Sequence, residues 1–233
     1  MKLWVFGDSY SIPLHVWQNN NEVTFTRNKY DTNWITEVAK SLSVTESNVF
    51  SQFGVSNEWI FEQVMMQAEN FGSDDYVIIQ LTNSNRHWFF PEHPQRSNFN
   101  QSIVDVNTDS TTKKVIKAYI SHLQNDHLDS LIYSAIIYSF MYVRTMIPSI
   151  KMLLLPGFGA APNSIGNLSD NVCDIEFKTK EIQQLFYDKT GFDSRLNHMT
   201  IDNHYVLADK VVNSFINNTP LDLTTGFKAN IYT

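Results

Sequence analysis

The stretch that decides the fold is KLWVFGDSY, residues 2–10. Its first five residues are typical of a short buried strand, and Gly7 then allows the backbone to turn sharply. Ser9 follows just past the carboxyl end of this strand, where open α/β sheets bind their ligands. The Ser9 hydroxyl is therefore a candidate nucleophile. The alternative is ordinary turn chemistry, because Gly-Asp-Ser is common in turns and Asp-Ser often caps a helix.

Strand-like and helix-like segments alternate along the rest of the chain, which favours a parallel sheet flanked by helices. We predict strands at residues 2–6, 48–52, 76–81 and 151–155. We predict helices at residues 34–42, 57–71, 181–187 and 201–217, with two more between 113 and 146. Asp31, Thr32 and Asn33 supply candidate caps for the first helix, and Asn57 is the expected cap of the second. The expected fold class is α/β.

The length of 233 residues favours one domain with a sizeable core. We expect a single domain over residues 1–219 and a C-terminal tail at 220–233. Residues 86–112 break the alternation with an aromatic-rich loop insertion, in which Arg86, His87 and Trp88 are candidate substrate contacts. The alternative is a surface excursion that its aromatic rings pin down.

Charge and composition exclude several classes of partner. The formal net charge is −7 and there is no dense run of Lys or Arg, so we expect no nucleic-acid partner. The single cysteine, Cys173, excludes an internal disulfide. The apolar run at 131–147 is interrupted by Arg144 and indicates a buried helix rather than a membrane span. With no signal peptide recognised, we expect a cytoplasmic or virion-associated protein without a membrane partner.

Three further residues stand at element boundaries, where they could converge with Ser9. Gly54 follows the second predicted strand, Asn83 follows the third, and His198 precedes the last helix. Each has a plain alternative, respectively a tight turn, a helix cap and a surface loop residue. Their order and their positions at the ends of elements favour one shared site.

These residues resemble the four blocks of the GDSL/SGNH hydrolase superfamily, named for a Ser, a Gly, an Asn and a His. The first block is FGDSY, residues 6–10; the second is GVSN, residues 54–57; the last is HMT, residues 198–200. The resemblance implies a flavodoxin-like, three-layer α/β/α sandwich with a central, mostly parallel sheet. It spans nearly the whole chain, from residue 2 to about 217.

Two positions depart from the family pattern. In the third block Leu81 replaces the usual Gly, so the family Asn corresponds to Asn83 or, with a shift of two, to Asn85. The usual triad Asp, three residues before His198, is Arg195 here. Asp193 and Asn197 are the nearby groups that could orient the imidazole instead.

The resemblance implies an ester hydrolase with an acyl-enzyme mechanism. Ser9 attacks the carbonyl, and His198 accepts its proton and returns it to the leaving alcohol. The backbone N–H groups of Ser9 and Gly54 and the side-chain amide of Asn83 form the oxyanion hole. We assign Asp8 to hydrogen bonds that shape the turn rather than to proton transfer.

The expected substrates are small acyl esters, and an O-acetylated carbohydrate is one candidate because the rings of the insertion could stack on sugar faces. We expect no metal, since neither the His122/His127 nor the Asp188/Asp193 spacing matches a ligand motif, and no cofactor. The oligomeric state stays open. The alternative function is a weakly active or inactive SGNH-like module with a binding or structural role, for instance in a viral particle.

Overall fold

The structure is a computed structural model. It describes residues 1–12, 14–19, 22–27, 33–52, 54–82, 84, 86–88, 110–155, 175–177, 201–223, 225–227 and 230–232.

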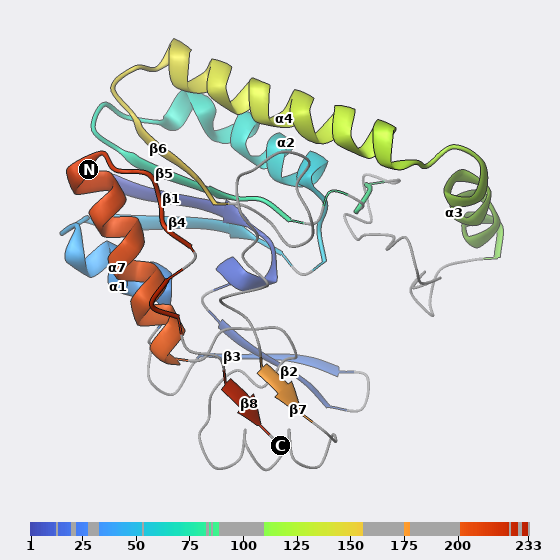
Figure 1. The fold of residues 1–233 in the computed structure, drawn as a ribbon, viewed down its shortest axis with the longest axis horizontal. Coiled ribbons are helices and arrows are strands. Elements are labelled where there is room, and N and C mark those ends of the chain that lie inside the picture. Colours follow the sequence, from blue (N-terminus) through green and yellow to red (C-terminus); the bar gives the residue numbers. More distant parts are fainter. Residues whose placement is uncertain are drawn as a thin grey trace.

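A parallel sheet of four strands, in the order β4-β1-β5-β6, forms the centre of the fold (Figure 1). The strands are β1 (Lys2–Gly7), β4 (Glu46–Ser51), β5 (Tyr76–Gln80) and β6 (Lys151–Leu155). Phe6 of β1 lies opposite Phe50 of β4 on one side and Ile79 of β5 on the other. Every residue of β5 is buried, as expected for a parallel strand covered on both faces. The predicted α/β class is confirmed.

Helices cover both faces of this sheet. Within the described ranges the α-helices are α1 (Trp34–Ser41), α2 (Asn57–Gln67), α3 (Ser110–His122), α4 (Asp126–Met146) and α7 (Ile201–Asn217). Figure 1 shows α1 and α7 side by side on one face and α2 and α4 on the other. None of the helices in these ranges is both long enough and apolar enough to cross a membrane.

The alternation of side chains along β1 divides the core into two clusters. Leu3 and Val5 pack with the helices α1 and α7, whereas Trp4 and Phe6 pack with α2 and α4. Successive residues of a strand point to opposite faces of the sheet, and helices cover both faces here, so all four side chains are buried. Packing on both faces therefore fixes the position of β1, and the residues after its carboxyl end begin from a defined place.

The helix boundaries follow their capping residues. Of the three candidate caps of α1, Asn33 is the one that the structure shows, with its Oδ1 2.9 Å from the backbone nitrogen of Thr36. The segment 113–146 is divided into two helices as predicted, because Asn125 caps α4. The prediction that Asn57 caps α2 is wrong. The cap is Ser56, and α2 ends at Gln67, followed by the short 3-10 helix η2 (Ala68–Asn70) rather than continuing to residue 71.

Two small sheets lie apart from the central one (Figure 1). The strands β2 (Leu14–Asn19) and β3 (Glu22–Arg27) form an antiparallel hairpin, and β7 (Ile175–Phe177) pairs in parallel with β8 (Asn230–Tyr232). None of these four strands was predicted. Leu223, in the segment predicted as a tail, is buried in the cluster with α1 and α7. The helix predicted at 181–187 lies outside the described residues.

Candidate functional site

Three turns meet at the carboxyl edge of the sheet. Asp8 follows β1, Gly54 lies three residues after β4, and Thr82 lies two residues after β5. The chain passes from β1 to β4 on one side and then returns to β5 on the other, so β1 and β5 flank the point at which the strand order reverses. Ligands of open α/β sheets bind outside the carboxyl ends of the strands at this point.

The 3-10 helix η1 (Ser9–Ser11) begins directly after β1 and places Ser9 at this edge. It is held against β5, because the hydroxyl of Ser11 donates to Oε1 of Gln80 at 2.5 Å and both side chains are buried. A Cβ atom on Gly7 would lie 2.7 Å from the Ser11 hydroxyl oxygen and 2.9 Å from Gln80 Oε1. Glycine is therefore required at position 7 by close approach, in addition to its role in the turn.

The carboxylate of Asp8 is the centre of a buried hydrogen-bond network. Its Oδ1 accepts from the backbone N–H of Tyr10 at 3.1 Å and from Nε2 of Gln80 at 3.0 Å. Its Oδ2 accepts from the Thr82 hydroxyl at 2.8 Å and from Nη1 of Arg86 at 2.9 Å. Asp8 is fully buried, so these four donors replace its solvent. The contacts agree with the role in shaping the turn that the sequence predicts for Asp8.

The second turn is fixed to the third by one side chain of α2. Gly54 has a φ of +61°, in the left-handed region where glycine avoids the cost of a side chain. Two residues further on, Ser56 caps α2 and leaves Asn57 facing β5. Asn57 Nδ2 donates to the Thr82 carbonyl at 3.0 Å, while its Oδ1 accepts from the Thr82 N–H at 2.8 Å. Both backbone groups of Thr82 are thus satisfied in a buried place.

A chain of contacts connects η1 to the start of α7. The indole N–H of Trp34 donates to the Tyr10 carbonyl at 2.9 Å, and the backbone N–H of Trp34 donates to Nδ1 of His204 at 3.2 Å. Trp34 is almost fully buried at the first position of α1, and His204 lies in the first turn of α7. The helix that follows His198 in the sequence therefore begins close to the turn that carries Ser9.

Five of the predicted site residues lie outside the described part of the chain: Asn83, Asn85, Asp193, Asn197 and His198. For Ser9 the structure gives the place in the backbone, at the first position of η1. The roles assigned to these residues stay predictions.

Arg86, His87 and Trp88, the candidate substrate contacts, point into the protein more than out of it. Besides Asp8, Nη1 of Arg86 contacts the Thr82 hydroxyl at 2.6 Å. The Nε atom of Arg86 and the indole nitrogen of Trp88 are buried without a partner in the described part of the chain.

His87 is buried between two helices. Its Nδ1 lies 3.4 Å from Glu58 Oε1 of α2, and its Nε2 lies 3.1 Å from Asp129 Oδ1 of α4. Burial alone would lower the pKa of His87, but the hydrogen bond and charge of Glu58, together with the charge of Asp129, outweigh it and raise the pKa above its usual value. His87 thus joins the start of the insertion to both helices.

Among the described residues, no three His, Cys, Asp or Glu side chains are grouped so that they could hold a metal ion.

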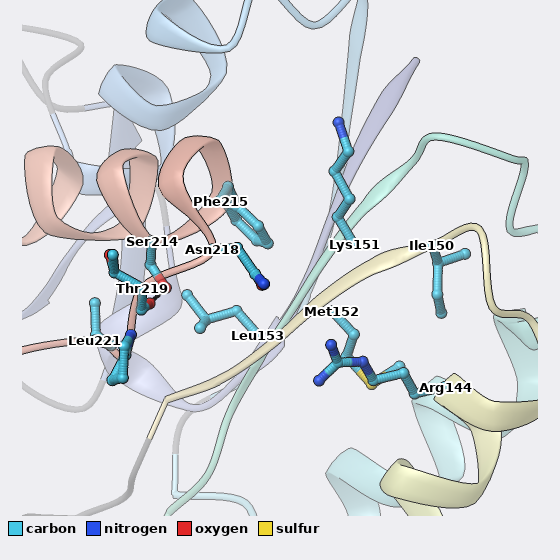
Figure 2. A pocket seen from close by; sticks show the side chains of 11 residues that line it. Arg144, Ile150, Lys151, Met152, Leu153, Ser214, Phe215, Asn218, Thr219 and Leu221 are labelled. Carbon is cyan, nitrogen blue, oxygen red and sulfur yellow. Dashed lines mark hydrogen bonds between the residues drawn. The ribbon is translucent and has the colours of Figure 1, made fainter.

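A groove of about 340 Å³ lies along the amino-terminal half of β6, between the ends of α4 and α7 (Figure 2). It is lined by residues such as Arg144, Lys151 and Asn218, and it belongs to the amino edge of the sheet rather than to the turns after the strands.

Comparison with known proteins adds no assignment. No protein-family model, no curated protein and no solved structure matches this chain.

Proposed function

We propose that the chain is a serine ester hydrolase of the SGNH type, with Ser9 as nucleophile and His198 as general base. The proposal includes the finer fold that this family has, a flavodoxin-like three-layer sandwich. The order β4-β1-β5-β6 supports it, because in chain order these strands read 2-1-3-4, as in flavodoxin-like sheets.

The contact chain through Trp34 is the observation that carries the proposal. His198 stands three residues before Ile201, the first residue of α7, and three residues of extended chain span at most about 10 Å. The first turn of α7 is one residue, Trp34, away from the carbonyl of Tyr10. The proposal puts His198 at the entry of α7 beside the Ser9 hydroxyl, and the contact of α7 with η1 through Trp34 supports it.

Each group then has a defined chemical task. His198 accepts the proton of Ser9 as the hydroxyl attacks the carbonyl carbon, and it then protonates the leaving alcohol. The negative charge that develops on the carbonyl oxygen is stabilised by the N–H groups of Ser9 and Gly54 and by the amide of Asn83. The left-handed backbone of Gly54 and the Asn57–Thr82 pair support the turns that carry these donors. Water attacks the acyl-enzyme in the second half of the reaction.

The experiment compares the hydrolysis of 4-nitrophenyl acetate by the wild type, Ser9→Ala and Ser139→Ala. Ser139 is a matched control, because its hydroxyl donates to the Ala135 carbonyl one turn earlier in α4, away from the turns that carry the proposed site. We expect Ser9→Ala to lose at least about 10³-fold in kcat while Ser139→Ala keeps the wild-type value. Equal rates for the wild type and Ser9→Ala would contradict the enzyme and leave the binding or structural module.

A further inference from the structure

Among the described residues, the only charged partner of the buried Asp8 carboxylate is Arg86. Two of the other three donors to Asp8 are uncharged side chains and one is a backbone N–H. Arg86 is 2.9 Å away, and its side chain is itself mostly buried. A buried carboxylate that loses its counter-charge becomes an uncompensated charge, which is strongly destabilising. Arg86 is therefore the residue that makes a charged Asp8 tolerable here.

Asp8 in turn determines the geometry of the nucleophile turn. It is the N-cap of η1, and its Oδ1 accepts the N–H of Tyr10, so the backbone of Ser9 is enclosed between the two ends of this hydrogen bond. A capping residue that loses its acceptor destabilises the first turn of its helix and lets that turn move. Movement of this turn would displace Ser9.

The same guanidinium nitrogen also contacts Thr82, two residues after β5. Nη1 of Arg86 lies 2.6 Å from the hydroxyl of Thr82, four residues earlier, while that hydroxyl donates to Asp8. Asn83 stands between these two residues in the sequence. One nitrogen atom thus joins the turn of the proposed nucleophile to the segment of the proposed oxyanion donor.

We infer that Arg86 is a positioning residue for the proposed hydrolysis, holding the turn that carries Ser9 in register with Thr82 through its contacts with Asp8 and the Thr82 hydroxyl. The inference rests on the proposed function. It assigns Arg86 a role behind the reacting groups rather than in contact with the substrate. A displacement of about 1 Å between reacting groups can cost about 10²-fold in rate, and it acts on the transition state more than on binding.

The test measures kcat and KM for 4-nitrophenyl acetate with Arg86→Gln, Arg86→Lys, Asp8→Asn and the double variant Asp8→Asn/Arg86→Gln. We expect Arg86→Gln to lower kcat about 10²-fold with KM changed less than about threefold. Arg86→Lys keeps the charge and one donor nitrogen, so it recovers kcat to within about tenfold of the wild type. A side chain that only filled space would show neither the split between kcat and KM nor the recovery by lysine.

Thermal unfolding tests the ion pair between Arg86 and Asp8 independently of the kinetics. We expect Arg86→Gln to lower the melting temperature by about 5–15 °C, and the second change Asp8→Asn to restore part of this loss because it removes the unpaired charge. If Arg86→Gln does not fold, the double variant replaces it in the kinetic assay, where the same loss of kcat is expected.

The outcomes separate the two proposals. Wild-type kcat in Arg86→Gln, or in the double variant, overturns the role of Arg86 while the ester hydrolase stands. A large rise in KM at unchanged kcat also overturns it, because Arg86 would then bind substrate. No turnover by the wild type contradicts the hydrolase, and this role falls with it.

Discussion

Replacement of Gly7 by alanine would put a methyl group where two buried side chains already lie. The new Cβ would be 2.7 Å from the hydroxyl oxygen of Ser11, 3.0 Å from its Cβ and 2.9 Å from Oε1 of Gln80. Neither neighbour can move away freely, since Ser11 and Gln80 are buried and bond to each other. The substitution therefore separates the pair that holds η1 against β5.

The expected loss follows from these contacts. An extra carbon in a closely packed interior costs about 1–3 kcal/mol. Breaking the bond between Ser11 and Gln80 leaves two buried polar atoms less well satisfied and adds about 1 kcal/mol. We therefore expect Gly7→Ala to lower the free energy of unfolding by about 2–4 kcal/mol, which corresponds to a fall in Tm of about 5–15 °C for a chain of this size.

Urea unfolding followed by circular dichroism measures the difference directly. The matched control is Gly72→Ala, whose new Cβ would have its nearest neighbour, Asp75 Oδ2, at 3.3 Å. We expect that control to lose less than about 1 kcal/mol. A loss for Gly7→Ala that is equal to or smaller than the loss for Gly72→Ala would refute the close approach of η1 to β5.

Three further predictions use other parts of the network. Asn57→Ala should cost about 2–4 kcal/mol of stability, because it leaves both backbone groups of Thr82 buried and unpaired, whereas the exposed Asn70→Ala should cost less than about 0.5 kcal/mol in the same denaturant assay. Because the pKa of His87 is raised in the folded chain, its protonation stabilises the fold. This contribution is fully present below the ordinary pKa of about 6.5 and is lost as the pH rises through the folded pKa. The free energy of unfolding, measured from about pH 6 to pH 8.5, should therefore fall in the wild type and stay flatter in His87→Gln. Trp34→Phe removes the indole N–H that bonds to η1 and should lower kcat for 4-nitrophenyl acetate about tenfold or more with little change in KM; an unchanged kcat would show that this contact does not position the site.

The fold could be predicted where local pattern and burial agree. The uninterrupted apolar run of β5 and the periodic apolar positions of α7 gave both elements to within a residue. The hairpin of β2 and β3 was missed although it had a signal, since LHVWQN and EVTFTR combine β-branched and aromatic residues on either side of two asparagines. The pairing of β7 with β8 joins segments more than fifty residues apart, and no local pattern could indicate it.

The candidate site could be predicted only as a set of positions. Residues that follow parallel strands must meet at one edge, which is why Asp8, Gly54 and Thr82 come together. Which side chain contacts which is a property of the packed structure. The Asp8–Arg86 pair spans 78 positions and the Trp34–His204 bond spans 170, so neither follows from sequence spacing. Arg86 carried a charge in an aromatic segment, and that was its only signal.

Covalent labelling with a fluorophosphonate tests the central claim most directly, because the reagent reacts only with a serine whose proton a nearby base can accept. The wild type and His198→Ala are treated alike, and the modified peptide is identified by mass spectrometry. The account predicts an adduct on Ser9 in the wild type and its loss in His198→Ala. Labelling of another serine, or labelling of Ser9 that does not depend on His198, would contradict it.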